Sequence, residues 1–180
     1  MRRSLRETAE TAITAVLIFV ALQVTTQSFM VEGSSMSPTL QDGQRLLVNR
    51  FVYARADASL FGSDHYLFHG PQRGDIVVFK PPNGSTTDYV KRVIALPGDT
   101  VNVVDGEVFV NGELTDYVDI DTSAREDEYP AVVPPDEYFV LGDNRGVSND
   151  SRNWGFVDGD AIVGRAWVTY WPWDAFRLFH

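Results

Sequence analysis

The hydrophobic positions of the chain recur mainly with a period of two, the spacing of residues on one face of a β-strand. Branched and aromatic residues form short runs bounded by Gly, Pro, Asn or Asp, a pattern typical of strands joined by tight turns. The predicted strands are residues 44–53, 76–80, 89–94, 101–104, 107–110, 137–141 and 165–170. We therefore expect a mainly β fold built from antiparallel sheets.

Residues 100–138 are expected to form a small β subdomain inserted into the main sheet. Two of the short strand-like runs are joined by Asp105-Gly106 and Asn111-Gly112, which favour hairpin turns. An acidic run over residues 116–128 follows, without a partnered base or a metal-ligand spacing. We interpret that run as a solvated face rather than a site.

The longest apolar run lies near the amino terminus. Residues 11–31 contain no charged side chain and are long enough for the roughly 20 residues that a helix needs to cross a bilayer. Arginines precede this run and Glu32 follows it, so the positive-inside rule predicts a cytoplasmic segment over residues 1–10. Residues 11–31 would be one transmembrane helix, and residues 32–180 an extracytoplasmic domain at the cell membrane.

A cleaved secretory signal is the alternative interpretation of this terminus, because the most apolar part, residues 12–24, is short. Thr26 and Ser28 would make a poor small-residue cleavage site, so a retained anchor is favoured. Ser35 follows Val31 by only four residues. At no more than about 3.5 Å per residue, its hydroxyl would lie within roughly 14 Å of the membrane surface.

Composition and charge exclude several classes of function. Hydrophobic residues make up 44% and charged residues 22% of the 180 residues, which is a globular composition. A net charge of −10 argues against a nucleic-acid partner. The chain has no cysteine, which excludes a disulfide, a thiolate nucleophile and a cysteine zinc site. His65 and His69 lie in a predicted loop over residues 54–72, so we expect no metal ion, and we expect no cofactor.

Three stretches carry candidate chemistry. Residues 33–40 read Gly-Ser-Ser-Met-Ser-Pro-Thr-Leu, which fits either an ordinary turn or a nucleophile loop. Strand alternation separates Lys91 from Arg92, so one of these two cations shares a face with apolar side chains. Lys91 is then either an edge-strand lysine or one desolvated enough to be neutral near pH 7. Residues 142–152 form a polar loop that either makes ion pairs or holds Ser148 against Lys91.

Aromatic residues gather at the carboxyl terminus. We expect Trp167 and Tyr170 to pack into the core from a final strand. Residues 171–179 are expected to form a membrane-contacting patch, since Trp and Tyr favour membrane interfaces.

These stretches together resemble, in order, the conserved boxes of type I signal peptidases of the bacterial leader peptidase form. The matching segments are residues 35–40, 73–79, 89–92 with 96–99, and 142–145 with Ser148, Asp150, Ser151 and Arg152. The resemblance implies a membrane-anchored, mainly antiparallel β fold with a catalytic Ser-Lys dyad. Ser35 would be the nucleophile and Lys91 the general base, with Ser148 orienting the lysine. It implies supporting roles for the loop residues Asp143, Asn144, Arg145, Asp150 and Arg152.

The same resemblance implies how the oxyanion and the substrate are bound. Some family members carry an oxyanion-stabilising serine two residues before the nucleophile, where this chain has Gly33. The backbone N–H of Ser35 is then the expected main donor, and whether Gly33 or Ser34 supplies a second donor is open. Expected substrates are exported preproteins cut after a small residue, with a second small residue two positions earlier. The implied pocket residues are Phe29, Val31, Met36, Leu40, Leu46, Val78, Tyr89 and Val90.

Two other functions fit parts of the sequence. A self-cleaving repressor-type peptidase also uses a Ser-Lys pair, but such proteins are soluble and DNA-linked, which the apolar anchor and acidic charge disfavour. A catalytically silent, membrane-anchored β domain that binds exported chains is the alternative from another class. On the favoured interpretation, the partners are preproteins emerging from the export machinery and the lipid bilayer.

Overall fold

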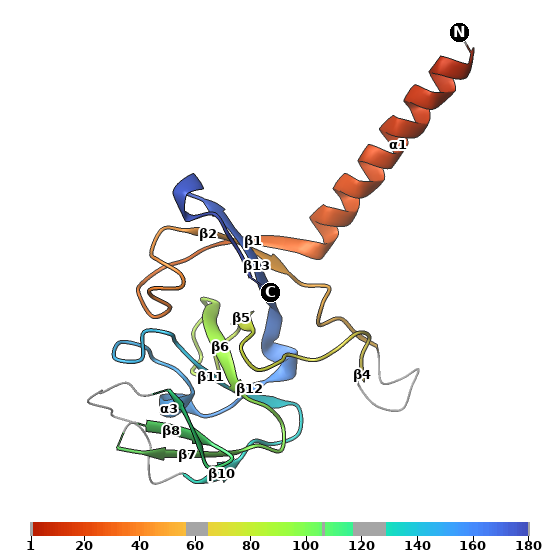
Figure 1. Cartoon of the computed structure of the whole chain (residues 1–180). Helices are drawn as coiled ribbons and strands as arrows, with labels where there is room; N and C mark the ends of the chain where they lie inside the picture. Colours follow the sequence, from red (N-terminus) through yellow and green to blue (C-terminus); the bar gives the residue numbers. More distant parts are fainter. Residues whose placement is uncertain (1, 57–64, 106, 117–128, 180) are drawn as a thin grey trace.

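A computed structural model of the chain describes residues 2–56, 65–105, 107–116 and 129–179. Figure 1 shows one long helix, α1, projecting away from a domain made mostly of strands. Most of the acidic run over residues 116–128 lies outside the described residues, as does the side chain of His65.

Helix α1 spans Arg2–Thr25, and its apolar part, Arg6–Thr25, has a mean hydropathy of 1.6 and makes no buried contact with the domain. By length and composition this helix could cross a membrane. The predicted end of the helix at residue 31 is wrong, because Thr26–Met30 form strand β1. Ser35 is therefore separated from the helix by a strand, and the distance to the membrane inferred from a helix ending at residue 31 no longer holds.

One large antiparallel sheet forms the centre of the domain. Its order is β1-β2-β13-β5-β6-β11-β12, with β14 paired to β13. The strands not yet placed are β2 (Arg45–Asn49), β5 (Ile76–Phe79), β6 (Tyr89–Ala95), β11 (Glu137–Leu141), β12 (Val157–Asp158), β13 (Ile162–Trp171) and β14 (Arg177–Leu178). Three short helical turns complete this part, namely α3 (Ser151–Trp154), η2 (Gly159–Ala161) and η3 (Trp173–Ala175).

A second, four-stranded sheet with the order β10-β7-β8-β9 lies at the end of the domain away from α1 (Figure 1). Its strands are β7 (Thr100–Val104), β8 (Glu107–Val110), β9 (Glu113–Asp116) and β10 (Ala131–Val132). They lie in the chain between β6 and β11, which pair directly with each other. The predicted fold class, antiparallel β with an inserted β unit and a preceding apolar helix, is therefore confirmed.

Strand β2 is shorter than the predicted run over residues 44–53. The Oδ1 atom of Asn49 accepts hydrogen bonds from the backbone N–H groups of Phe51 and Val52, at 2.9 and 3.2 Å. These two N–H groups are then no longer available for hydrogen bonds to a neighbouring strand, so the strand does not continue. The chain then forms a two-stranded ribbon of β3 (Arg55–Ala56) and β4 (His65–Tyr66), where the sequence predicted only a loop.

The core lies on both faces of the large sheet. Every residue of β5 is buried, with Ile76 and Val78 packing on one face and Val77 and Phe79 on the other. In β13, Ala166 and Val168 point inward, so Trp167 between them is 39% exposed and the prediction that it packs in the core is wrong. Tyr170 is half-buried, and its hydroxyl lies 2.7 Å from Oγ of Ser28.

Candidate active site

The loop between β1 and β2 carries Ser35. Gly33 adopts a positive φ of 84°, and its N–H donates to Oδ1 of Asp42 at 2.7 Å, which turns the chain sharply. Met36 and Leu40, 1% and 0% exposed, anchor the loop in the core. This anchoring holds Ser35, which is half-buried, on an ordered loop rather than a free one.

Strand β6 carries Lys91 at the register position of Val77 in β5. Lys91 is only 4% exposed and shares its buried face with Val93 and Ala95. Arg92 is on the opposite face, where its guanidinium donates to both carboxylate oxygens of Asp143 at 2.8 and 2.6 Å. Of the two neighbouring cations, Lys91 is therefore the one that the apolar face desolvates.

Lys91 and Ser35 are in direct contact. Nζ of Lys91 lies 2.7 Å from Oγ of Ser35, a hydrogen-bond distance. Burial lowers the pKa of Lys91 from 10.5 to about 8, against the negative charges of Asp150 and Asp143, which favour the ammonium form. With that pKa about a tenth of the molecules carry a neutral amine at pH 7, whereas an unperturbed lysine would be almost wholly protonated.

The loop after β11 is held by a buried ion pair. Nε and Nη2 of Arg152 donate to the two oxygens of Asp150 at 2.9 and 3.0 Å, and neither residue is more than 3% exposed. Asp150 also accepts from the N–H of Gly142 at 3.0 Å, and Arg152 donates to the carbonyl of Arg145 at 2.7 Å. The pair therefore supports both ends of the loop.

Asn144 joins this loop to the nucleophile loop. Its backbone N–H donates to the carbonyl of Ser35 at 2.9 Å, and its Nδ2 donates to the carbonyl of Ser34 at 3.1 Å. The sequence placed Asn144 only among the loop residues, because a contact between segments so far apart leaves no trace in strand periodicity. The neighbouring Asp143 is partly buried, which opposes ionisation, but hydrogen bonds from Arg92 and Thr39 lower its pKa overall.

Ser148 lies near the dyad without hydrogen-bonding to Lys91. It is 8% exposed, and its Oγ has no hydrogen-bond partner among the described residues. A Cβ on Gly142 would overlap Oγ of Ser148 and lie 2.5 Å from the carbonyl oxygen of Ser35. The three residues are therefore tightly packed, and the lysine-orienting role of Ser148 stays a prediction.

A cleft of about 690 Å³ opens beside Ser35 and Lys91, within the size range of ligand sites. Both Ser35 and Lys91 line it. So do six of the eight predicted pocket residues, namely Phe29, Val31, Leu46, Val78, Tyr89 and Val90. Met36 and Leu40 do not, since the side chains of both are buried in the core. The sequence did not single out other lining residues, which include Met30, Glu32, Ser85, Thr87, Asp88, Val147 and Asn149.

Backbone N–H groups that can bind an oxyanion lie in the same cleft. The N–H of Ser35 has no hydrogen-bond acceptor within the described part of the chain. Gly33 and Ser34 are exposed and both line the cleft. Ser35 therefore offers a free backbone donor, and the second donor stays open between its two predecessors.

Three exposed carboxylates, those of Asp136, Asp158 and Asp160, bring oxygens within 4.8 Å of one another. Arg55 already donates to Asp136 and to Asp160 at 2.7 Å each, so two of the three carboxylates are bound by a guanidinium. Nδ1 of His69 lies 2.9 Å from the carbonyl oxygen of Gly70. We assign no metal to either place.

Comparison with known proteins bears out the resemblance seen in the sequence. The family model described as signal peptidase, peptidase S26, matches residues 5–171. The probable signal peptidase I-2 of Synechocystis sp. is 37% identical over 172 residues, which cover 92% of this chain and 73% of the relative. Signal peptidase IB of Staphylococcus aureus is 33% identical over 184 residues, covering 92% and 88%.

A solved signal peptidase I from Enterococcus faecalis shares 32% identity and a TM-score of 0.43, over 54% of this chain and 97% of that chain. The family assignment does not depend on that structure, because the sequence matches run along most of the chain. The chain thus belongs to the signal peptidase family, peptidase S26, and is a hydrolase of the serine peptidase class.

Proposed function

We propose that the chain is a membrane-anchored endopeptidase that removes signal peptides from exported preproteins, with Ser35 as nucleophile and Lys91 as general base. Membership of the signal peptidase family supports signal-peptide removal. One observation carries the residue assignment, namely the 2.7 Å contact between a buried lysine amine and a serine hydroxyl that both line one cleft.

The chemistry follows from the neutral amine. Nζ of Lys91 takes the hydroxyl proton as Oγ of Ser35 attacks the scissile carbonyl carbon, and the free N–H of Ser35 donates to the developing oxyanion. The ammonium then gives its proton to the leaving amine, which leaves an acyl-enzyme on Ser35. Water attacks that ester, with Lys91 again the base, and releases the signal peptide with a free carboxylate.

The cleft also supports the selection of small residues. Phe29, Val31 and Leu46 from β1, the loop after it and β2 line the cleft together with Val78 and Val90 from β5 and β6. Apolar walls of this kind leave shallow pockets, which suit small side chains at alternate positions of an extended peptide. Strand β1 is the first strand in the order of the main sheet, so one of its edges is available for such a peptide.

We place the protein at the cell membrane as a single-pass protein with a cytoplasmic amino terminus. The apolar part of α1, Arg6–Thr25, is the candidate span, and the amino-terminal arginines favour the cytoplasmic side. The catalytic domain then begins at β1 on the extracytoplasmic face, with the inserted unit near residues 100–138. Preproteins leaving the export machinery would meet the cleft there.

Cleavage of a purified preprotein with an Ala-x-Ala site by the full chain in detergent tests the proposal. We expect cutting by the wild type and by Lys80→Met, an exposed lysine outside the cleft, and none by Ser35→Ala or Lys91→Met. The rate should rise with pH through about 8, because burial lowers the pKa of Lys91 to that value. A folded wild type that binds the preprotein without cutting it would favour the silent binding domain instead.

A further inference from the structure

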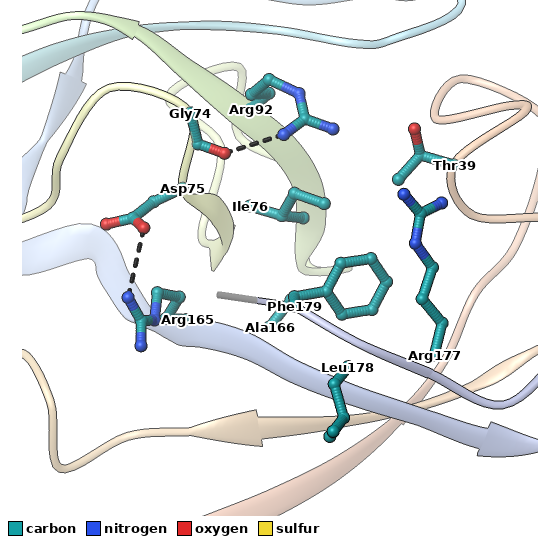
Figure 2. Close-up of a pocket in the computed structure, with 10 residues that line it drawn as sticks. All are labelled: Thr39, Gly74, Asp75, Ile76, Arg92, Arg165, Ala166, Arg177, Leu178 and Phe179. Carbon is teal, nitrogen blue, oxygen red and sulfur yellow. Dashed lines mark hydrogen bonds and ion pairs between the residues drawn. The ribbon is translucent and has the colours of Figure 1, made fainter.

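A second pocket shares no lining residue with the cleft. It has a volume of about 230 Å³, and its walls include Thr39, Ile76 and Phe179 (Figure 2). Three arginines also line it, Arg92 from β6, Arg165 from β13 and Arg177 from β14. Such a gathering of cations is unexpected in a chain with a net charge of −10.

The charges of this pocket do not balance. Arg92 is paired with Asp143, and Arg165 makes a single long contact of 3.4 Å with Asp75. Arg177 has no ion pair in the described part of the chain. Among the described residues, the three guanidinium groups therefore have two carboxylate partners, which leaves one positive charge in excess.

Arg177 also makes no hydrogen bond to another described residue. A guanidinium has five N–H donors. Cζ of Arg177 lies 5.6 Å from the ring centroid of Phe179, a cation–π contact that is not a hydrogen bond. Figure 2 shows its guanidinium directed toward the side of the pocket where Thr39 and Arg92 lie, while Arg165 lies beside Asp75. An anion at Arg177 would meet free donors in a positive field.

We propose that this pocket binds a phosphate group with Arg177 as its main ligand, and that the headgroup of an anionic phospholipid is its favoured source. A planar guanidinium matches two phosphate oxygens, and a phosphodiester carries the single negative charge that the pocket lacks. The carboxyl-terminal hairpin supports a lipid source, because Arg177 directly follows the exposed Trp171, Trp173 and Phe176. The lipid source rests on the membrane anchoring proposed above, whereas the phosphate site does not.

Calorimetric titration of the full chain in a non-ionic detergent tests this proposal. The probes are inorganic phosphate and short-chain phosphatidylglycerol, with sodium chloride at equal ionic strength as the blank. We expect saturable binding that weakens about tenfold in Arg177→Gln, the loss typical of one charge-assisted hydrogen bond. Arg177→Lys keeps the positive charge but loses the planar guanidinium that can bind two oxygens, so the affinity of this variant for phosphate should lie between those of the wild type and Arg177→Gln. Lys80→Gln, an exposed cation outside the pocket, should bind like the wild type.

The two probes separate the sources. Saturation by phosphatidylglycerol identifies a lipid ligand, and saturation by inorganic phosphate alone supports the pocket while assigning it a free phosphate. Absence of saturation with both probes, or equal affinity of the wild type and Arg177→Gln, overturns the proposal. No preprotein is present in this titration, so its failure leaves the peptidase assignment untouched, and a loss of cleavage leaves the pocket untouched.

Discussion

Replacing Lys91 by methionine should abolish cleavage and yet stabilise the fold at neutral pH. The pKa of Lys91 falls from 10.5 to about 8 because the folded protein buries its amine. Between these values the unfolded chain binds more protons than the folded one, so the stability of the wild type rises with pH across that window. Below pH 8 the buried ammonium costs about 3 kcal/mol of folding free energy.

The net effect of Lys91→Met follows from two opposing contributions. Methionine removes that cost of about 3 kcal/mol at pH 7 and fills a similar space. It also loses the hydrogen bond to Ser35, which is worth about 1 kcal/mol, so the variant should be more stable by about 2 kcal/mol. At pH 10 the ammonium penalty has shrunk to about 1 kcal/mol, and the two proteins should be nearly equal.

Urea unfolding of the full chain in detergent at pH 7 and pH 10 measures this difference, with Lys80→Met as the control for loss of an exposed lysine. The control should differ little from the wild type at either pH. A Lys91→Met variant that is less stable than the wild type at pH 7, or a difference that does not change with pH, would refute the reasoning. The amine would then be neither buried nor titrating as the geometry requires.

Three further predictions concern the surroundings of the dyad. Gly142→Ala should lower the cleavage rate at least about tenfold, because the new Cβ would lie 2.5 Å from the carbonyl oxygen of Ser35. Steady-state kinetics of the two proteins, each first shown to be folded, test this. Arg92→Gln removes the guanidinium that pairs with Asp143, so the uncompensated carboxylate should raise the pKa of Lys91 and move the pH–rate profile to higher pH. An unchanged profile would contradict this. Trp173→Ser, at a side chain 77% exposed, should weaken binding of a variant lacking residues 1–25 to anionic liposomes, measured by co-sedimentation.

The sequence predicted the fold class because strand periodicity is a local signal, whereas the resemblance to signal peptidases singled out Ser35 and Lys91, which the structure brings into contact. Period-two hydrophobicity identified the strands, and the same alternation put Lys91 and Arg92 on opposite faces of β6 without showing which of the two is buried. The end of α1 was missed because residues 26–30 form a strand only by pairing with β2. Trp167 was misplaced because aromatic content was weighed above the alternation that buries its neighbours.

Contacts between distant loops could not be predicted at all. The hydrogen bonds from Asn144 to Ser34 and Ser35 connect residues 110 positions apart in one case, and no periodicity reports them. The same limit explains why Met36 and Leu40 were expected in the substrate pocket. Their place beside Ser35 is visible in the sequence, whereas their direction into the core depends on the packing of β2, β5 and β13 against the loop.

The two ion pairs near Ser35 and Lys91, of which Arg152–Asp150 is buried and Arg92–Asp143 partly buried, have a common electrostatic effect. Asp143 and Asp150 both favour the ammonium form of Lys91, so uncompensated carboxylates there would raise its pKa toward that of an ordinary lysine. Each is instead bound by a two-pronged guanidinium, Arg92 on Asp143 and Arg152 on Asp150. The carboxylates can therefore hold the loop against the nucleophile while their charges are largely neutralised. The ion pairs that order this loop therefore leave the pKa of Lys91 low.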